Sequence, residues 1–173
     1  MRALRRIVDV LAEGSGALLH AQTYSHHAVA CAAGFATLEY IADHDLVARC
    51  AGMAPAFHAA LEPLRDLPHV GDVRGRGLLA GIEFVADKAS RVPFPRSVRF
   101  AERFAEAALN AGLVVWPNAG QADGINGDLV MLAPPFIITE SEIAMMADRL
   151  RTALAATVAT TVATTAAQMP TPR

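Results

Sequence analysis

The chain of 173 residues has little of several residue types that mark particular classes of protein. Its two cysteines, Cys31 and Cys50, are too few for a disulfide framework. Its net charge of −2 does not favour binding to nucleic acid or to an anionic membrane surface. No apolar stretch approaches the ~20 residues of a membrane span. Asp9 and Glu13 interrupt the basic start of the chain, which is not typical of a signal peptide. We therefore expect a cytoplasmic protein with no nucleic-acid partner and no membrane partner.

Apolar residues are abundant instead. They make up 53% of the chain, and the mean hydropathy is +0.31. The length indicates one domain that can bury a sizeable core. The apolar excess fits a piece that packs against another domain or chain. The alternative is that the many alanines raise the mean hydropathy without forming a surface that binds another domain or chain.

Residues 20–34 join a polar turn to the start of a helix, and the rest of the chain is organised around them. The turn carries the hydroxyls of Thr23, Tyr24 and Ser25. The spacing of apolar residues predicts a helix over residues 28–42. The start of a helix offers N–H groups and the positive end of the helix dipole, which suit an anion such as a phosphate. The alternative, which the spacing alone favours, is that Thr23 or Ser25 caps the helix.

The remaining periodicity predicts an α+β fold, with helices on one face of a small, mostly antiparallel sheet. Pro55 predicts a kink or break in one of these helices, and Thr139 with Glu142 forms a capping box at the start of another. From residue 157 the Ala/Thr repeats predict a disordered tail. The predicted helices are 4–12, 28–42, 46–64, 97–110 and one from Thr139 onward, and the predicted strands lie within 69–87 and at 113–116 and 129–132.

Two patterns resemble sites that the sequence does not support. The six histidines include no pair four residues apart with a carboxylate partner, so we predict no metal site. Residues 75–81 are rich in glycine, but they lead into a strand, whereas a dinucleotide loop leaves a strand and opens a helix. The alternative is a strand entry where two backbones pass closely.

Three motifs, in the same order, resemble the class III (omega-type) pyridoxal-phosphate aminotransferases. Residues 20–33 are similar to the family segment H-G-x-T-Y-S-G-H-P-x-A-C-A-A, with Ala21 and Ala28 where the family usually has glycine and proline. Residues 73–83 are similar to the strand V-R-G-x-G-L-x-x-G-I-E. Residues 127–139 are similar to a G-D segment that ends in A-P-P-x-I-I-T. The resemblance covers roughly residues 7–156.

The resemblance implies a fold, a cofactor and partners. Residues 1–45 would be the end of the large domain and the interdomain helix, 46–156 the small C-terminal domain of a PLP-transferase-like fold, and 157–173 a tail. The cofactor would be pyridoxal phosphate. Thr23, with the backbone N–H groups of Gln22 and Thr23, would contact its phosphate across a dimer interface. The partners would be a second copy or a complementary large-domain chain, a small-molecule amino donor and an oxo acid. His20 and His27 match family positions and are interpreted as structural hydrogen-bonding residues.

The family residues that carry the chemistry lie upstream of these motifs. They are the lysine that forms a Schiff base with the cofactor, the acid that pairs with the pyridinium nitrogen, and a glycine-rich cradle. The only lysine here, Lys88, lies between a strand and a proline-bearing loop and is interpreted as a surface residue. We therefore predict no catalytic residue. The chain would be an aminotransferase fragment, inactive alone, that belongs to an enzyme transferring an amino group from an amine or amino acid to an oxo acid. The alternative is a non-catalytic α+β module for interaction or dimerisation.

Recognition of the substrate carboxylate is not assigned to a residue. Arg74 and Arg76 offer the bidentate geometry that a carboxylate requires. Pairing with Asp72 or Glu83 at the surface is the favoured alternative. The family often places an arginine near the A-P-P motif, where this chain has polar side chains without an arginine: Asn118, Gln121, Asp123 and Asn126.

Overall fold

The computed structural model describes residues 5–17, 23 and 26–167, with side chains described to residue 161. The chain divides into two compact units, residues 1–44 and 45–173. The predicted boundary between residues 45 and 46 lies close to this division. The assignment of the two parts to a large and a small domain stays a prediction.

Among its described residues the first unit contains two helices, α1 (Arg5–Glu13) and α2 (Ala28–Asp43), as the periodicity predicts. None of the described side chains in either helix is buried within the chain. In α2 this exposure includes large apolar side chains, among them Phe35, Leu38 and Tyr40. The apolar side chains of α2 therefore form no buried core among the described residues of this unit.

The second unit contains three long helices, α3 (Leu46–Leu61), α4 (Phe100–Asn110) and α5 (Glu140–Ala167), and two 3₁₀ segments, η1 (Glu62–Asp66) and η2 (Arg96–Val98). The α3 helix continues through Pro55, so the chain does not break there, whereas the alternative, a kink at Pro55, stays a prediction. It ends at Leu61, where η1 begins and Pro63 follows. None of the described helices is both long enough and apolar enough to cross a membrane.

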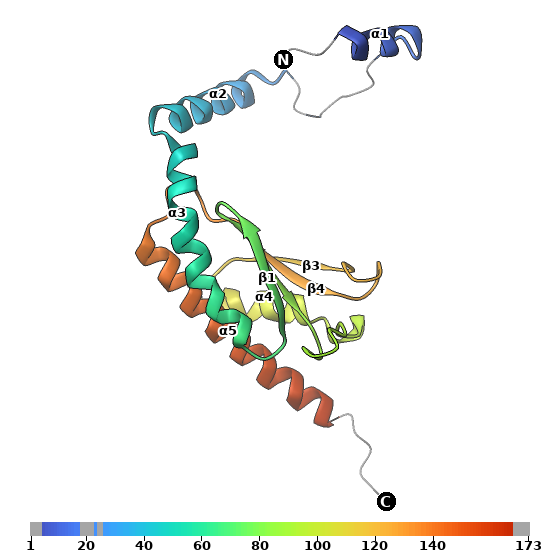
Figure 1. The fold of residues 1–173 in the computed structure, drawn as a ribbon, viewed down its shortest axis with the longest axis vertical. Coiled ribbons are helices and arrows are strands. Elements are labelled where there is room, and N and C mark those ends of the chain that lie inside the picture. The colour runs from blue at the N-terminus through green and yellow to red at the C-terminus, as the bar shows by residue number, and fades with distance from the viewer. Residues whose placement is uncertain (1–4, 18–22, 24–25, 168–173) are drawn as a thin grey trace, which may run out of the picture. The chain divides into compact units, whose positions relative to one another are not determined.

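A four-stranded antiparallel sheet lies beside these helices (Figure 1). Its strands are β1 (Val70–Arg76), β2 (Leu79–Phe84), β3 (Trp116–Ala119) and β4 (Asp128–Leu132), in the order β1-β2-β4-β3. The strand predicted within residues 69–87 from its alternation is confirmed as β2. β1 was not predicted and forms a hairpin with β2, because Gly77 with φ +60° turns the chain between them. The strand predicted at 113–116 lies mostly later, because β3 pairs with β4 from Trp116 onward.

The core lies between the helices and one face of the sheet. Along β2, Ala80, Ile82 and Phe84 are buried and alternate with residues that are more exposed. Phe84 contacts Phe100 and Phe104 of α4, at ring-centroid distances of 5.0 and 4.8 Å. These features confirm the predicted α+β class with helices packed on a small antiparallel sheet.

The C-terminal helix is longer than the sequence indicates. α5 continues to Ala167, so the prediction of a disordered tail from residue 157 is wrong for residues 157–167. Thr157 is buried, and its hydroxyl donates to the Ala153 carbonyl at 2.7 Å. This side-chain bond removes the cost of burying a hydroxyl, so a threonine can lie on the packed side of a helix.

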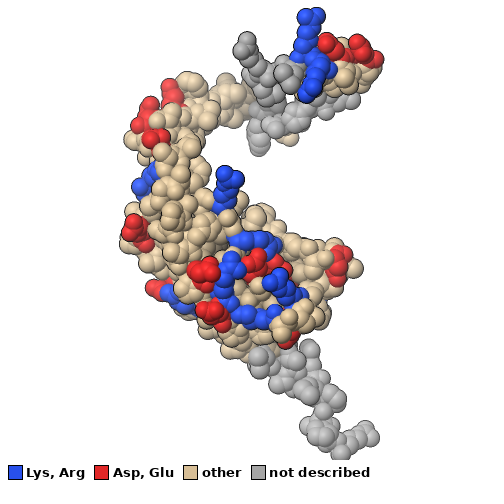
Figure 2. All heavy atoms as spheres, in the orientation of Figure 1, with Lys and Arg blue, Asp and Glu red and all other residues tan. Residues whose placement is uncertain are grey.

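The opposite face of the sheet carries charged side chains over β1 and β2 (Figure 2). Arg74 Nη1 lies 3.0 Å from Asp72 Oδ2 and 2.5 Å from Glu83 Oε2. Arg65 Nη1 lies 2.6 Å from Asp72 Oδ1. The preferred interpretation of Arg74, pairing with these two acids at the surface, is therefore confirmed.

Candidate functional site

The predicted phosphate contact falls in the first unit. Thr23 is exposed, whereas Gln22 and Ser25 lie outside the described residues. The cap of α2 is His27, whose Nδ1 accepts the Ala30 N–H at 3.2 Å. The expectation that Thr23 or Ser25 caps this helix is therefore wrong. The interpretation of His27 as a structural hydrogen-bonding residue is confirmed.

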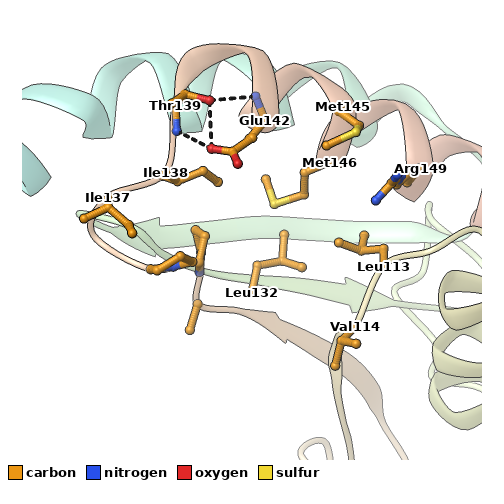
Figure 3. Close-up of a pocket in the computed structure, with 13 residues that line it drawn as sticks. Leu113, Val114, Leu132, Ile137, Ile138, Thr139, Glu142, Met145, Met146 and Arg149 are labelled. Atoms are coloured by element: carbon orange, nitrogen blue, oxygen red, sulfur yellow. Dashed lines mark hydrogen bonds between the residues drawn. The ribbon is translucent and has the colours of Figure 1, made fainter.

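In the second unit, the A-P-P motif forms one wall of an open pocket of about 630 Å³ (Figure 3). The chain between α4 and β3 and the first turns of α5 form the other walls. Ile137 lies at one end, and Leu113 and Arg149 lie at the other. The lining is mostly apolar: Leu113, Val114, Leu132, Ala133, Pro134, Pro135, Ile137, Ile138, Thr139, Glu142, Met145, Met146 and Arg149.

Arg49 of α3 holds the loop that forms this wall. Its Nε donates to the Phe136 carbonyl at 3.0 Å, and its Nη2 donates to the carbonyls of Ile137 at 3.2 Å and Ile138 at 2.7 Å. A guanidinium is suited to this role because its N–H donors lie in one rigid plane. Arg49 therefore determines the course of the loop between β4 and α5.

Polar groups at the rim of the pocket are bonded within the chain. The Glu142 carboxylate accepts the Thr139 N–H at 2.8 Å and the Thr139 hydroxyl at 2.7 Å (Figure 3). These bonds lower the pKa of Glu142 and confirm the predicted capping box. At the other end, Arg149 Nη1 donates to the Gly112 carbonyl at 2.7 Å. These bonds fix both ends of the pocket.

Asp128, the acid of the G-D motif, stabilises the start of α4. The residue before this helix, Arg99, has φ +54° and a side chain with no acceptor for the first N–H groups. Asp128 Oδ1 supplies that acceptor, since it binds the Ala101 N–H at 2.9 Å. Asp128 is only 1% exposed, and its Oδ2 has no hydrogen-bond partner among the described residues.

We expect the stability of the wild-type chain relative to Asp128→Asn to fall as the pH rises from about 4. Burial raises the pKa of Asp128, and the charge of Glu102 adds to this, whereas the Ala101 N–H and Arg96 oppose it. A carboxyl group with a raised pKa in the folded state stabilises the fold while it is protonated, and this contribution is lost as the pH passes the raised value.

Urea titrations of both proteins at several pH values would test this expectation. The asparagine variant cannot titrate at this position, so it removes the opposing effect of acids such as Asp72 and Glu102, whose pKa values are lowered. Each pKa unit between folded and unfolded Asp128 corresponds to about 1.4 kcal/mol in the difference. A difference that does not vary with pH would show that Asp128 is not perturbed.

The polar residues near the A-P-P motif build the loop between β3 and β4. Asp123 Oδ1 accepts the N–H groups of Ile125 at 2.9 Å and Asn126 at 2.6 Å. The side chain and the N–H of Asn126, together with the Ile125 N–H, lower the pKa of Asp123. Asn126 Oδ1 in turn accepts the Arg96 N–H at 3.0 Å. The side chains of Asp123 and Asn126 therefore form hydrogen bonds within the chain.

The glycine-rich stretch and Lys88 also have structural roles. A Cβ on Gly75 would lie 2.1 Å from the Leu79 carbonyl oxygen, which confirms a strand entry where two backbones pass closely. Lys88 is exposed, and its Nζ donates to the carbonyls of Arg65 at 2.6 Å and Leu67 at 3.0 Å. The ammonium group thus holds the end of η1.

Comparison with known proteins agrees with the three motifs. The family model for class III aminotransferases matches residues 2–154. An adenosylmethionine-8-amino-7-oxononanoate aminotransferase of Methanocaldococcus jannaschii is 36% identical over 137 residues, which are 79% of this chain and 28% of that protein. An omega-aminotransferase of Caulobacter vibrioides is 37% identical over 152 residues, which are 86% of this chain and 31% of that protein.

A solved structure shows that the fold is also similar. The omega-transferase of Vibrio fluvialis matches with a TM-score of 0.71 at 30% identity, over 91% of this chain and 36% of that one. The chain thus spans about a third of the length of the relatives that it matches. The match extends over nearly the whole of this chain and includes both the sequence motifs and the fold. The chain belongs to the class III aminotransferase family.

Proposed function

We propose that this chain forms the C-terminal third of a pyridoxal-phosphate-dependent aminotransferase, which transfers an amino group from an amine or amino acid to an oxo acid in the cytoplasm. The observation that carries the proposal is the family match over residues 2–154, together with coverage of only about a third of the relatives' length. The bound cofactor supplies the electron sink for the chemistry. This chain supplies part of the cofactor site and the packing that positions it.

Thr23 is the residue that we assign to the cofactor phosphate, together with the backbone N–H of Gln22. The Thr23 side chain is exposed, and its hydroxyl is a donor that suits a phosphate oxygen. It precedes α2, whose positive end favours an anion. In a homodimer, or in a complex with a complementary large-domain chain, this contact would be made to the cofactor of the neighbouring subunit.

Lys88 does not fit the role of the lysine that binds the cofactor covalently. Such a lysine needs a desolvated position that lowers its pKa. The Lys88 side chain is instead exposed and bound to two carbonyls. The residues present therefore fit a phosphate contact and not a covalent attachment.

The full chain alone, mixed with pyridoxal phosphate, should gain no more cofactor on borohydride reduction than a denatured sample does, and it should transfer no amino group. Mass spectrometry of the reduced protein provides the readout. A denatured sample is the control, because a surface lysine reacts without a fold. An adduct on Lys88 that forms only in the native chain would contradict the proposal.

An assembled enzyme tests Thr23. When this chain is combined with the complementary two thirds of a class III aminotransferase, Thr23→Ala should weaken retention of pyridoxal phosphate about tenfold, since a hydrogen bond to a charged group contributes about 1.5–3 kcal/mol. The matched control is Thr37→Ala, because the Thr37 hydroxyl bonds within α2 to the Ala33 carbonyl at 2.8 Å. Equal retention in both variants would remove Thr23 from the site.

The alternative function, a non-catalytic interaction module, is favoured by one observation. The second unit has its own buried core, so it has the means to fold without the rest of an enzyme. Both functions therefore predict cooperative unfolding of this unit. They differ in the complemented assembly, where only the aminotransferase function predicts amino transfer.

A further inference from the structure

The helices α4 and α5 lie side by side (Figure 1), and an open groove of about 550 Å³ runs between them. Each wall of the groove consists of residues three or four apart on one helix, so each set shares one helix face. These residues are Arg103, Glu106 and Asn110 of α4, and Thr152, Ala156 and Thr160 of α5. None of them lines the pocket beside the A-P-P motif. The groove is therefore a separate surface of the second unit.

Several polar side chains at and beside this groove already have partners within the chain. The Thr152 hydroxyl donates to the Asp148 carbonyl at 3.0 Å. On α4, the Glu102 carboxylate accepts Arg96 Nη1 at 3.1 Å and lies 3.8 Å from Arg99 Nε. The chain itself therefore neutralises the charges next to the groove.

Arg103 and Glu106 keep charges that the chain does not use. Among the described residues, neither side chain has an ion pair or a hydrogen bond, although the two lie three residues apart on α4. Glu106 is exposed and Arg103 is half-buried. Small-molecule sites are concave and enclose most of the ligand surface. The open groove, with exposed side chains on both walls, fits the surface of another protein instead.

The order of the two charges indicates which protein fits. Along α4 a positive side chain is followed, three residues later, by a negative one. An antiparallel helix with the same pair presents the opposite charge at both positions. A second copy related by a two-fold axis therefore supplies the complement of Arg103 and Glu106 without any further residue.

We propose that the α4–α5 groove is an interface with a second copy of this chain, in which Arg103 of each copy pairs with Glu106 of the other. Small side chains also line the groove, among them Ala107, Ala111 and Ala156, so a second helix can approach closely. The interface involves the second unit alone. It does not depend on the proposed function, in which Thr23 of the first unit contacts the cofactor of a neighbouring subunit.

Sedimentation equilibrium of the full chain over a range of concentrations tests this interface. Exposed ion pairs are weak and are screened by salt, so the wild-type chain should form a reversible dimer that dissociates when the salt concentration is raised roughly tenfold. Arg103→Glu and Glu106→Arg should each weaken the dimer at least about tenfold, because each brings like charges together at two symmetry-related positions.

The matched control is Arg91→Glu. It changes the net charge by the same amount as Arg103→Glu, at an exposed arginine outside the groove. It should change the affinity of the dimer less than about twofold, since it acts only through the screened net charge.

An equimolar mixture of the two single variants gives the most specific result. In a dimer of Arg103→Glu with Glu106→Arg, opposite charges meet at both positions, and the same holds for a dimer of the chain that carries both substitutions. Both samples should therefore regain an affinity within about threefold of the wild type. A variant that lost association because it unfolds would not recover in the mixture.

Three results would overturn the proposal. The first is a wild-type chain that stays monomeric at every concentration. The second is association that neither single variant weakens, as expected if the exposed apolar side chains of α2 caused it. The third is loss of association in the single variants without recovery in the mixture, because the two charges would then not meet across a two-fold axis.

Discussion

Gly75→Ala should destabilise the second unit by about 3 kcal/mol or more, which corresponds to a fall in Tm of roughly 10 °C. The new Cβ would lie 2.1 Å from the Leu79 carbonyl oxygen and 2.8 Å from the Ala80 Cα. Both are backbone atoms, so no side-chain rotation relieves the overlap. The β1–β2 hairpin would have to separate at the register Gly75–Ala80. Thermal unfolding followed by circular dichroism measures the effect.

Gly81→Ala is the matched control for this prediction. Gly81 lies in β2, and a Cβ there would be 4.0 Å from its nearest neighbours, the Arg74 and Val130 carbonyl oxygens. We expect a change within about 0.5 kcal/mol, in part because alanine restricts the unfolded chain. If both variants lost the same stability, glycine content in the sheet, and not the close approach at Gly75, would be the cause.

Arg49→Met should lower the free energy of unfolding by about 2 kcal/mol, because three carbonyls of the A-P-P loop would lose a charged donor. Water can replace part of this loss at the exposed carbonyls, so the cost stays below the sum of three bonds. Arg49→Lys should recover only part of it, since an ammonium group cannot span the loop as a guanidinium does. Urea titrations measure the three proteins.

Two further measurements make the Arg49 prediction specific. Arg76→Met removes an exposed arginine at the end of β1 and should change stability by less than about 0.5 kcal/mol. Amide exchange of the residues after Pro135 should become faster in Arg49→Met, since the loop would lose the bonds that hold it. Equal amide exchange rates in the variant and the wild type would show that the loop keeps its structure without the hydrogen bonds of Arg49.

Local chemistry was sufficient to predict the parts of this protein that depend on neighbours in the chain. The helical spacing over 28–42 and the Thr139–Glu142 capping box correspond to α2 and to the start of α5. The alternation in β2 identified a strand with one buried face. The three motifs identified the family that the comparisons show. Each of these signals is complete within a few residues.

Contacts between segments far apart in the sequence became evident only from the tertiary structure. β1 and β3 are edge strands with glycine, proline and polar residues, so neither shows alternation, and only pairing with β2 and β4 makes them strands. Asp128 binds an N–H 27 residues earlier, and Arg49 binds carbonyls 87–89 residues later. The pocket likewise brings Leu113 and Val114 together with side chains from the stretch between Leu132 and Arg149. Hydrogen bonds and packing act through space, so a role that depends on a partner far along the chain leaves no pattern in the residues around it.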